Sequence, residues 1–260
     1  RRTNDPWRVL VSEVMLQQTS VARVMPKYEA FLEAFPTPAA LAQAPLGEAL
    51  RLWSGLGYPR RCRNLQATAV VLHEQFNGRM PSSLDELLAL PGIGQYTARA
   101  VLAFAHRIDV AVVDVNVSRV LSRLEGVPMK ARALQELADE LIPEGLAWEW
   151  NQVMMDFGAR HCTVRSPQCD SCPVRSQCRY KGVGEDPAQL SAGVSKPQAR
   201  FEGSDRQARG RAMKAVSSGA MNIYDVVEAM RVEEQRALAL IASLVNEGLL
   251  QRTDVMITLP

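Results

Sequence analysis

The sequence lacks several features that would assign it directly to a class of protein. No apolar run approaches the roughly eighteen residues that a membrane span needs, and no charged-then-apolar leader precedes residue 20. The formal net charge is only +2, which by itself does not indicate a polyanionic partner, although a basic face can coexist with a near-neutral total. We therefore expect a soluble, cytoplasmic protein. Its 260 residues, 47% of them hydrophobic, suffice for one large domain or two smaller ones.

Cysteine is scarce too, but four of the five cysteines lie close together, as Cys162, Cys169, Cys172 and Cys178 in a C-x6-C-x2-C-x5-C pattern. In a chain without a secretory leader, thiols at this density favour a metal centre over a disulfide framework. Zinc sites usually bring two short C-x2-C pairs from separate hairpins, whereas here one short pair lies between two wider arms. The spacing favours a [4Fe-4S] cluster, with structural zinc and four unligated thiols as alternatives. Cys62 is expected to be an ordinary helix residue.

Apolar periodicity is helical almost everywhere up to residue 161, and strand-like alternation is scarce. A first helix follows Pro6, with an apolar stripe running from Trp7 to Met15. Further helices are expected at about 20–35, 38–44, 46–54, 60–76, 83–90, 95–106, 116–125, 131–142 and 146–160. Prolines separate many of these ranges. The sequence thus predicts an all-α domain that ends in the cysteine loop.

Residues 181–203 are rich in Gly, Pro, Ser, Gln and Lys and have no apolar stripe, which predicts a linker. Helices are then expected near 204–216, 222–230 and 232–247, followed by two short strands at 249–252 and 255–259. Three helices and a hairpin outline a small winged-helix-like module over 204–260. Helix-turn-helix units enter DNA grooves. Here, however, the third helix is apolar and begins with Glu233 and Glu234, so packing or partner contact is an equal alternative.

Three short stretches could carry chemistry. Glu13 and Gln17 share one side of the first helix, where they could address a substrate or belong to a solvated polar face. The turn Leu90–Gly94 offers two glycines and the N–H groups of the next helix to an anion such as a DNA phosphate, with a plain interhelical turn as the alternative. Asp114 follows an apolar run and precedes a helix. It could cap that helix, act as a cleft carboxylate, or do both.

Four motifs in order, followed by the cysteine loop, closely resemble the MutY-type adenine glycosylases of the helix-hairpin-helix DNA glycosylase superfamily. They are SEVMLQQT from Ser12, GLGY from Gly55, LPGIG from Leu90 and DVNV from Asp114. The resemblance runs from residue 1 to about 180. It implies an all-α glycosylase domain over 1–180, in which a six-helix subdomain (about 20–113) and a cluster subdomain (about 1–19 and 114–180) flank a catalytic cleft. The four cysteines are then the ligands of a [4Fe-4S] cluster.

The implied activity is removal of adenine mispaired with 8-oxoguanine or guanine from duplex DNA, after the base is flipped out of the stack. Glu13 matches the glutamate that protonates adenine N7, and a closed, desolvated pocket would favour its protonated form. Asp114 matches the aspartate that faces positive charge on the sugar, with Asn116 near it. Tyr96 occupies the place of a Schiff-base lysine, so a monofunctional enzyme is expected.

The resemblance also predicts which residues contact DNA. The protein is expected to be a monomer that associates with the bacterial nucleoid through DNA binding. Gln17 matches the wedge position, which fills the gap left in the base stack, with Leu56 or Tyr58 beside it. The remaining expected contacts are Gln18, Thr19, Gly92, Gly94 and Gln95.

The match to the family fails in two places. Val115 stands where the aspartate motif commonly has glycine, and the larger C-terminal domain that reads 8-oxoguanine is replaced by the short module. Two other functions are therefore kept as alternatives. One is a thymine glycosylase acting on T:G mispairs, which Glu13 disfavours because thymine has no N7. The other is a non-catalytic, cluster-bearing binder of damaged DNA.

Overall fold

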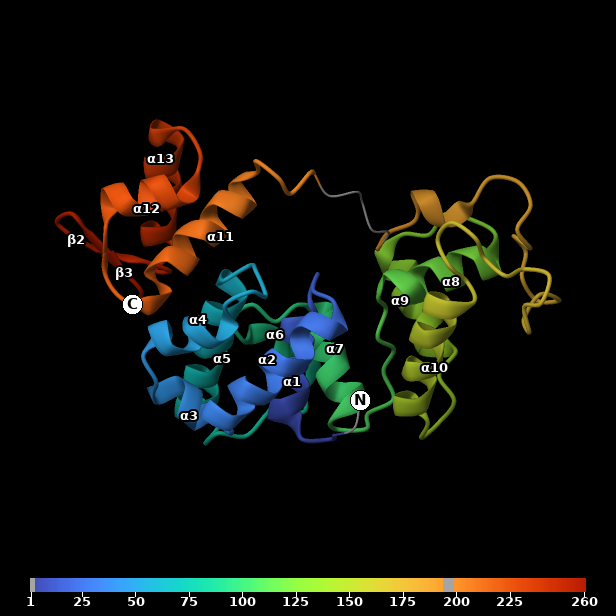
Figure 1. Cartoon of the computed structure of the whole chain (residues 1–260). Helices are drawn as coiled ribbons and strands as arrows, with labels where there is room; N and C mark the ends of the chain where they lie inside the picture. The colour runs from blue at the N-terminus through green and yellow to red at the C-terminus, as the bar shows by residue number, and fades with distance from the viewer. Residues whose placement is uncertain (1–2, 194–198) are drawn as a thin grey trace. The chain divides into compact units, whose positions relative to one another are not determined.

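The computed structural model describes residues 3–193 and 199–260, and it confirms the predicted all-α architecture (Figure 1). The first ten helices are α1 (Pro6–Leu16), α2 (Val21–Ala34), α3 (Pro38–Gln43), α4 (Leu46–Trp53), α5 (Arg60–Gln75), α6 (Leu84–Ala89), α7 (Gln95–Phe104), α8 (Val115–Glu125), α9 (Ala131–Glu140) and α10 (Ala147–Arg160). Each lies within a few residues of its predicted range. Within the described part of the chain, no helix is long and apolar enough to cross a membrane.

The chain divides into two compact units. One comprises Arg1–Val9, Ser82–Leu88 and Ile93–Pro197, and the other comprises Leu10–Pro81, Ala89–Gly92 and Gln198–Pro260. This division differs from the expected subdomains, which placed residues 20–113 together. Helix α7 instead belongs with the cysteine loop because it packs against α10.

The cysteine-bearing unit is built on α8, α9 and α10. Their apolar faces meet in a core that includes Val117, Leu121, Leu134 and Met154. The first half of the expected linker is part of this unit. A short 3-10 helix, η1 (Pro187–Leu190), packs on α8 with Pro187 and Ala188 buried, so the expectation that this segment buries nothing is wrong for these residues. Residues 194–198 of the expected linker lie outside the described residues.

The other unit has a core of aromatic and aliphatic side chains between α2, α3, α4 and α5. Phe31 of α2 makes edge-on contacts with Phe35 and with Trp53 of α4, at centroid distances of 5.0 and 5.8 Å. Thr37 accepts a hydrogen bond from Ala40 N and so caps α3, which begins at Pro38. These contacts hold the end of α4 and the loop after it in a fixed position.

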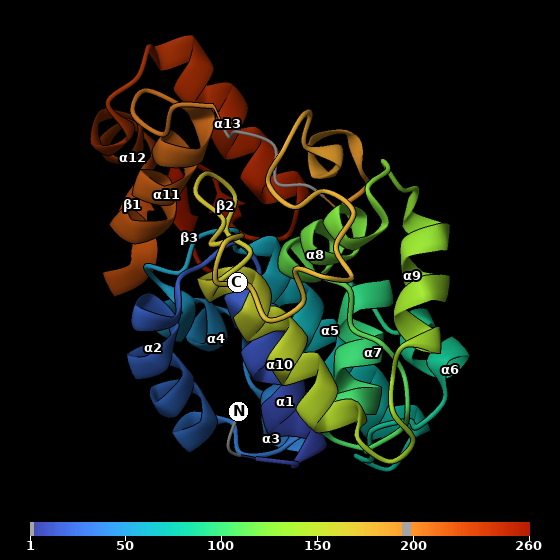
Figure 2. The same ribbon diagram turned by 90° about the vertical axis from the view of Figure 1, so that its right-hand side faces the viewer.

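The C-terminal module also belongs to this second unit. It contains α11 (Asp205–Ala215), η2 (Val216–Ser218), α12 (Ile223–Met230) and α13 (Glu234–Asn246), with strands β1 (Met221–Asn222), β2 (Gln251–Thr253) and β3 (Met256–Thr258) (Figures 1 and 2). The three helices and the hairpin are as predicted. Strand β1 is an addition that completes an antiparallel sheet in the order β1-β3-β2, with Met221 opposite Ile257.

The module packs closely on α4. Gly47 N donates a hydrogen bond of 2.8 Å to the carbonyl oxygen of Pro260, and a Cβ at Gly47 would lie 2.4 Å from that oxygen. Glycine is therefore required where the chain end meets α4. Arg51 of α4 adds a 3.0 Å hydrogen bond from Nε to the carbonyl of Ser217.

Candidate functional site

Glu13 lies in α1, and only 1% of it is exposed. The alternative that it belongs to a solvated polar face is therefore wrong. Leu10, Val14 and Met15 around it are buried as well, so α1 is enclosed almost all round at this level. A carboxyl group in such surroundings is costly unless it has partners or a function. Gln17 lies one residue beyond the end of the helix, at Leu16.

The turn after α1 and the loop after α4 are held together by one side chain, Arg61 of α5. Its Nη1 donates hydrogen bonds to the carbonyls of Val14 (2.7 Å), Met15 (3.0 Å) and Gln17 (2.7 Å). Its Nη2 donates to the carbonyls of Leu56 (3.2 Å) and Gly57 (3.1 Å) and to Oγ1 of Thr19 (3.2 Å). The structure thus brings Gln17, Thr19 and Leu56 together.

The Arg61 guanidinium is enclosed by rings as well as by carbonyls. It lies 5.4 Å from the ring centroids of both Trp53 and Tyr58. Burial lowers the pKa of Arg61 to about 10, which leaves it charged at neutral pH. Its position at the C-terminal carbonyls of α1 also favours a cation, because the helix dipole is negative at that end.

The two side chains expected beside Gln17 differ in exposure. The Leu56 side chain is buried, since only 2% of the residue is exposed. Its contribution to the loop is its carbonyl oxygen, which accepts a hydrogen bond from Arg61. Tyr58 is half-buried, has a φ of 51°, and accepts a 3.1 Å hydrogen bond at its hydroxyl from Nη1 of Arg206. Gln18 is exposed and has a φ of 55°. Of the side chains of Leu56 and Tyr58, only that of Tyr58 is partly accessible to solvent.

The glycine-containing turn joins α6 to α7. Thr68 of α5 donates 2.8 Å from Oγ1 to the carbonyl of Pro91, and Gly92 has a φ of +75°. A Cβ at Gly92 would lie 2.7 Å from Asn64, so this residue is restricted both by conformation and by space. Gly94 caps α7 and faces open space, and Gln95 is exposed. The start of α7 at Gly94 and Gln95 thus borders solvent. A helix N-terminus that faces solvent is a place where anions bind.

Asp114 is the N-cap of α8, as predicted. Its Oδ1 accepts hydrogen bonds from Asn116 N and Val117 N, and its Oδ2 accepts from Nδ2 of Asn116, each at 2.8 Å. These three bonds fix the carboxylate. Val115 is 40% exposed at the first turn of α8 and leaves the cap intact. Tyr96 is half-buried in the first turn of α7.

Arg119, one turn further along α8, supports this cap. Its Nη2 donates to Oδ1 of Asn116 (2.8 Å) and to the carbonyl of Gly158 (2.7 Å), and its Nε donates to the carbonyl of Cys162 (2.7 Å). Gly158 lies where α10 meets α8, and a Cβ there would be 2.7 Å from Cβ of Asn116. The close packing of the two helices therefore positions Asn116.

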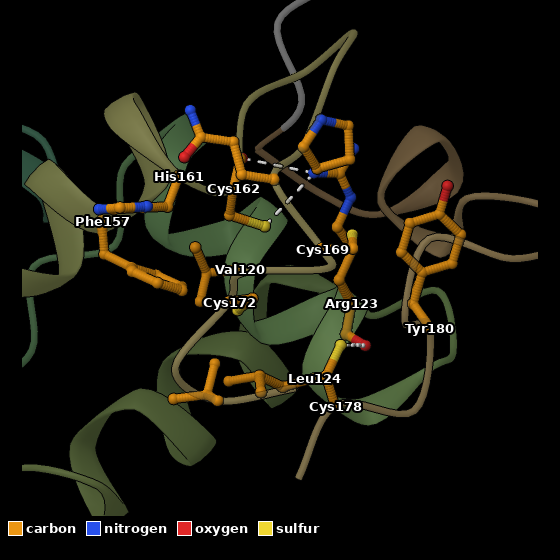
Figure 3. A pocket seen from close by; sticks show the side chains of 13 residues that line it. Val120, Arg123, Leu124, Phe157, His161, Cys162, Cys169, Cys172, Cys178 and Tyr180 are labelled. Carbon is orange, nitrogen blue, oxygen red and sulfur yellow. Dashed lines mark hydrogen bonds between the residues drawn. The ribbon is translucent and has the colours of Figure 1, made fainter. Parts of the chain in front are cut away.

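The four cysteines Cys162, Cys169, Cys172 and Cys178 line one small cavity of about 30 Å³ beside α8 (Figure 3). Arg123 donates from Nη1 to Sγ of Cys162 at 3.3 Å and forms a buried ion pair of 2.7 Å with Asp186. Lys181 N donates to Sγ of Cys178 at 3.5 Å. Across residues 3–193 and 199–260, no three His, Cys, Asp or Glu side chains form a group that could hold a metal ion.

The cysteine loop nevertheless fits a larger thiolate-ligated group. Four soft sulfur donors share one mostly apolar cavity with N–H donors and a cation at its edge, which matches the needs of an anionic iron–sulfur cluster. Gly182 has a φ of +82°, and a Cβ there would lie 2.9 Å from Sγ of Cys169. The loop backbone therefore follows the sulfur atoms closely. Cys62 is fully buried in α5, as expected for a structural residue.

Several supporting residues were missed by the motifs. Arg61, Arg119 and Arg123 act on backbone carbonyls far away in the sequence, and no local pattern reveals such contacts. Gly158 did carry a signal, because a glycine inside a helical pattern indicates close approach by a neighbour. Glu13 and Asp114 belong to different compact units, and each is positioned within its own.

Comparison with known proteins gives consistent results. Residues 11–144 match the family described as "HhH-GPD superfamily base excision DNA repair protein". The chain is 41% identical over 255 residues to an adenine DNA glycosylase from Mycolicibacterium smegmatis, a match that covers 95% of this chain and 85% of that protein. Among solved structures, it is similar to a thermostable thymine-DNA glycosylase, with TM-score 0.66 and 30% identity over 70% of this chain and 86% of that one. A trapped covalent endonuclease III–DNA intermediate is similar as well, with TM-score 0.63 and 30% identity over 68% and 85% of the two chains.

Proposed function

Because the chain belongs to the HhH-GPD superfamily of base excision DNA repair proteins, we propose that it is the adenine DNA glycosylase that its sequence motifs predict. It is an enzyme that hydrolyses the N-glycosidic bond of adenine in duplex DNA. The observation that carries the choice of adenine is Glu13, a carboxyl group only 1% exposed on α1. The 41% identity to an adenine DNA glycosylase, against 30% to a thymine-DNA glycosylase of known structure, agrees with this choice.

Base flipping is assigned to the loops that Arg61 holds. An adenine within a stacked duplex is out of reach, and extruding it costs a few kcal/mol. Gln17 fills the space that the base leaves, with Tyr58 beside it, and Gln18 and Thr19 extend the contact. The N–H groups at Gly92, Gly94 and Gln95 bind a phosphate. Ordering these loops before binding lowers the entropy lost on binding.

The chemical step uses two carboxyl groups. Glu13 donates a proton to adenine N7, which makes the base a better leaving group. Positive charge then develops on the sugar, and the carboxylate of Asp114 faces it. Opposite unit charges about 4 Å apart at an effective dielectric near 20 gain roughly 4 kcal/mol, enough for about a thousandfold in rate.

The product is an intact abasic strand. Tyr96 cannot form the imine that lysine forms in bifunctional relatives, so β-elimination is absent. Asn116, fixed by Arg119, holds Asp114 in place. The mispairs expected as substrates are adenine opposite 8-oxoguanine and adenine opposite guanine, and the working form is a monomer.

The cofactor assigned to Cys162, Cys169, Cys172 and Cys178 is a [4Fe-4S] cluster. When bound, it supplies a covalent anchor for the loop and a redox-active centre that base hydrolysis does not require. The chain's own residues do the rest: Arg123 neutralises charge at Cys162, and Lys181 N donates to Cys178. Purified protein should be brown and contain iron and acid-labile sulfide in equal amounts, whereas a colourless preparation with one zinc per chain would refute the cluster.

Activity on a panel of mispaired duplexes tests the function. Duplexes with adenine opposite 8-oxoguanine or guanine should acquire alkali-sensitive sites on the adenine strand, and a G:T duplex should not. Cleavage of the G:T duplex alone would end the adenine assignment. The strand should break only after alkali, because the enzyme is monofunctional.

Single substitutions test the two carboxyl groups. Glu13→Gln and Asp114→Asn should each lower the single-turnover rate by about a hundredfold or more. Glu33→Gln and Asp85→Asn change exposed carboxylates in α2 and α6 and serve as matched controls. If Glu13→Gln and Asp114→Asn both release adenine at the wild-type rate, the proposed roles are wrong and a non-catalytic DNA binder becomes the better description.

A further inference from the structure

A large groove lies in the unit that contains the C-terminal module, between α11 and the loop that follows α4. Its volume is about 1070 Å³. Six cationic side chains line it: Arg23, Arg60, Arg200, Arg206, Arg209 and Lys214. None of its lining residues, all of them described, is Asp or Glu. The whole chain has nearly equal numbers of basic and acidic residues, 30 Lys and Arg against 28 Asp and Glu. The groove is therefore much more basic than the protein as a whole.

Part of this positive charge is neutralised nearby and part is not. Glu247 pairs with both Arg60 and Arg209 at 2.6 Å, and Glu202 pairs with Arg200 at 2.6 Å. Arg23 and Lys214 are exposed and form no ion pair with any described residue. The cationic side chains that line the groove thus outnumber the carboxylates paired with them, and the groove lining itself contains no acidic residue. An anionic partner is the complement of such a surface.

The arrangement of α11 favours an extended polyanion over a small anion. Arg206, Gly210 and Lys214 recur at four-residue intervals, so they lie along one face of the helix. Gly210 presents no side chain, and a Cβ there would meet nothing within 4 Å, which lets a backbone come close to the helix. The row of sites along the helix matches the regular charges of a nucleic acid strand.

The groove is also lined by Gln18 and Tyr58, which belong to the loops assigned to the wedge. Arg206 of α11 donates a hydrogen bond to the Tyr58 hydroxyl and so connects the module to that loop directly. We propose that this groove holds the sugar–phosphate chain of the substrate duplex beside the wedge, so that the C-terminal module clamps DNA through α11. The inference rests on the proposed function for the identity of the polyanion.

Helix α13, which holds the position of a reading helix in winged-helix modules, is a poor alternative. Its first turn contains Glu233 and Glu234, and the Arg236 guanidinium is bound to Asp205 of α11 at 2.6 Å. Ala237, Ile241 and Leu244 are buried in the module core. Negative charge at its start repels phosphate, so the module acts on the DNA backbone through α11 instead of reading bases through α13.

The test measures binding of the full chain to an undamaged duplex over a range of salt concentrations by fluorescence anisotropy. Arg23→Gln combined with Lys214→Gln removes two exposed groove cations. Each phosphate contact contributes about 0.9 to the slope of log affinity against log salt. The double variant should therefore lose roughly 1.8 from the slope and bind about tenfold to thirtyfold more weakly near 0.15 M salt.

A control with the same net charge is Arg79→Gln combined with Lys130→Gln, two exposed cations outside the groove. Its slope should stay at the wild-type value. An unchanged slope in the groove variant, or an equal loss in both variants, would overturn the clamp. Because the duplex has no mispair, the readout does not depend on adenine chemistry. A wild-type protein that binds DNA in this way but releases no adenine would refute the proposed function and leave the groove assignment standing.

Discussion

Arg61 shows how a single half-buried cation can hold two loops together. Its five carbonyl acceptors come from the end of α1, from Gln17 and from the loop after α4. Within residues 3–193 and 199–260, no carboxylate accepts a hydrogen bond from Arg61, so its charge is neutralised by carbonyl dipoles and two aromatic rings. Such an arrangement depends on the planar fork of arginine, which the compact ammonium group of lysine cannot reproduce.

We expect Arg61→Lys to lower the free energy of unfolding by about 2 to 4 kcal/mol, because several partly buried carbonyl groups lose their hydrogen-bond donor. Urea denaturation followed by circular dichroism measures the change. Arg79→Lys, at an exposed site after α5, is the matched control and should be neutral within about 0.5 kcal/mol. A neutral result for Arg61→Lys would mean that solvent takes over these carbonyls.

At the scale of elements, two helical glycines in similar local settings have opposite environments. Gly158 in α10 lies against Asn116 of α8. A Cβ at Gly158 would clash with this residue, because it would lie 2.7 Å from the Asn116 Cβ and 2.9 Å from the Asn116 carbonyl oxygen. Gly210 in α11 faces open space. Helix propensity favours alanine over glycine by about 1 kcal/mol at both positions, so the difference between them isolates the helix–helix contact.

Gly158→Ala should therefore destabilise the protein by about 1 to 3 kcal/mol, since the clash outweighs the gain in propensity. Gly210→Ala should stabilise it by about 0.5 to 1 kcal/mol. Thermal unfolding of both variants tests the pair. Stabilisation by both substitutions would show that α8 and α10 can separate slightly at no cost, and would remove Gly158 from the support of Asn116.

Much of this element structure was predictable from the sequence, for identifiable reasons. Helical periodicity and the prolines between segments located the first ten helices, and Asp114 was recognised as a cap because N-cap preferences are local. Strand β1 was missed because two residues carry no period, and η1 because Pro187 and Ala188 are buried only through contact with α8. Arg61 and Arg119 were missed since their partners lie far away in the sequence.

At the scale of a whole compact unit, Glu247 links the C-terminal module to α5. It accepts hydrogen bonds from Arg60 of α5, Arg209 of α11 and Ser243 of α13, and its carbonyl accepts from Arg63. The hydrogen bond from Arg60, followed by those from Arg209 and Ser243, outweighs burial and lowers the pKa of Glu247 to about 2. In the unfolded chain the value is near 4.3.

The sign of the pH dependence follows from this difference. Because the pKa of Glu247 is lower in the folded than in the unfolded state, the ionised carboxylate stabilises the fold. This contribution is complete at pH values above the unfolded pKa of about 4.3 and disappears as the pH falls towards 2. Its size is about 1 to 2 kcal/mol, since the exposed Arg60 is screened by solvent. Wild type should exceed Glu247→Gln in stability at pH 6, and the difference should shrink between about pH 4 and 2. A difference independent of pH would contradict this linkage.

The hydrogen bonds of Arg119 give the cysteine loop an influence on chemistry in which its sulfur atoms take no part. The carbonyl of Cys162 orients Arg119, Arg119 orients the amide of Asn116, and that amide holds Oδ2 of Asp114. A displacement at Cys162 is therefore relayed over three polar contacts to Oδ2 of Asp114, the carboxylate that we propose faces the sugar. We therefore expect oxidative damage to the loop to lower the proposed activity by displacing one carboxylate oxygen atom of Asp114.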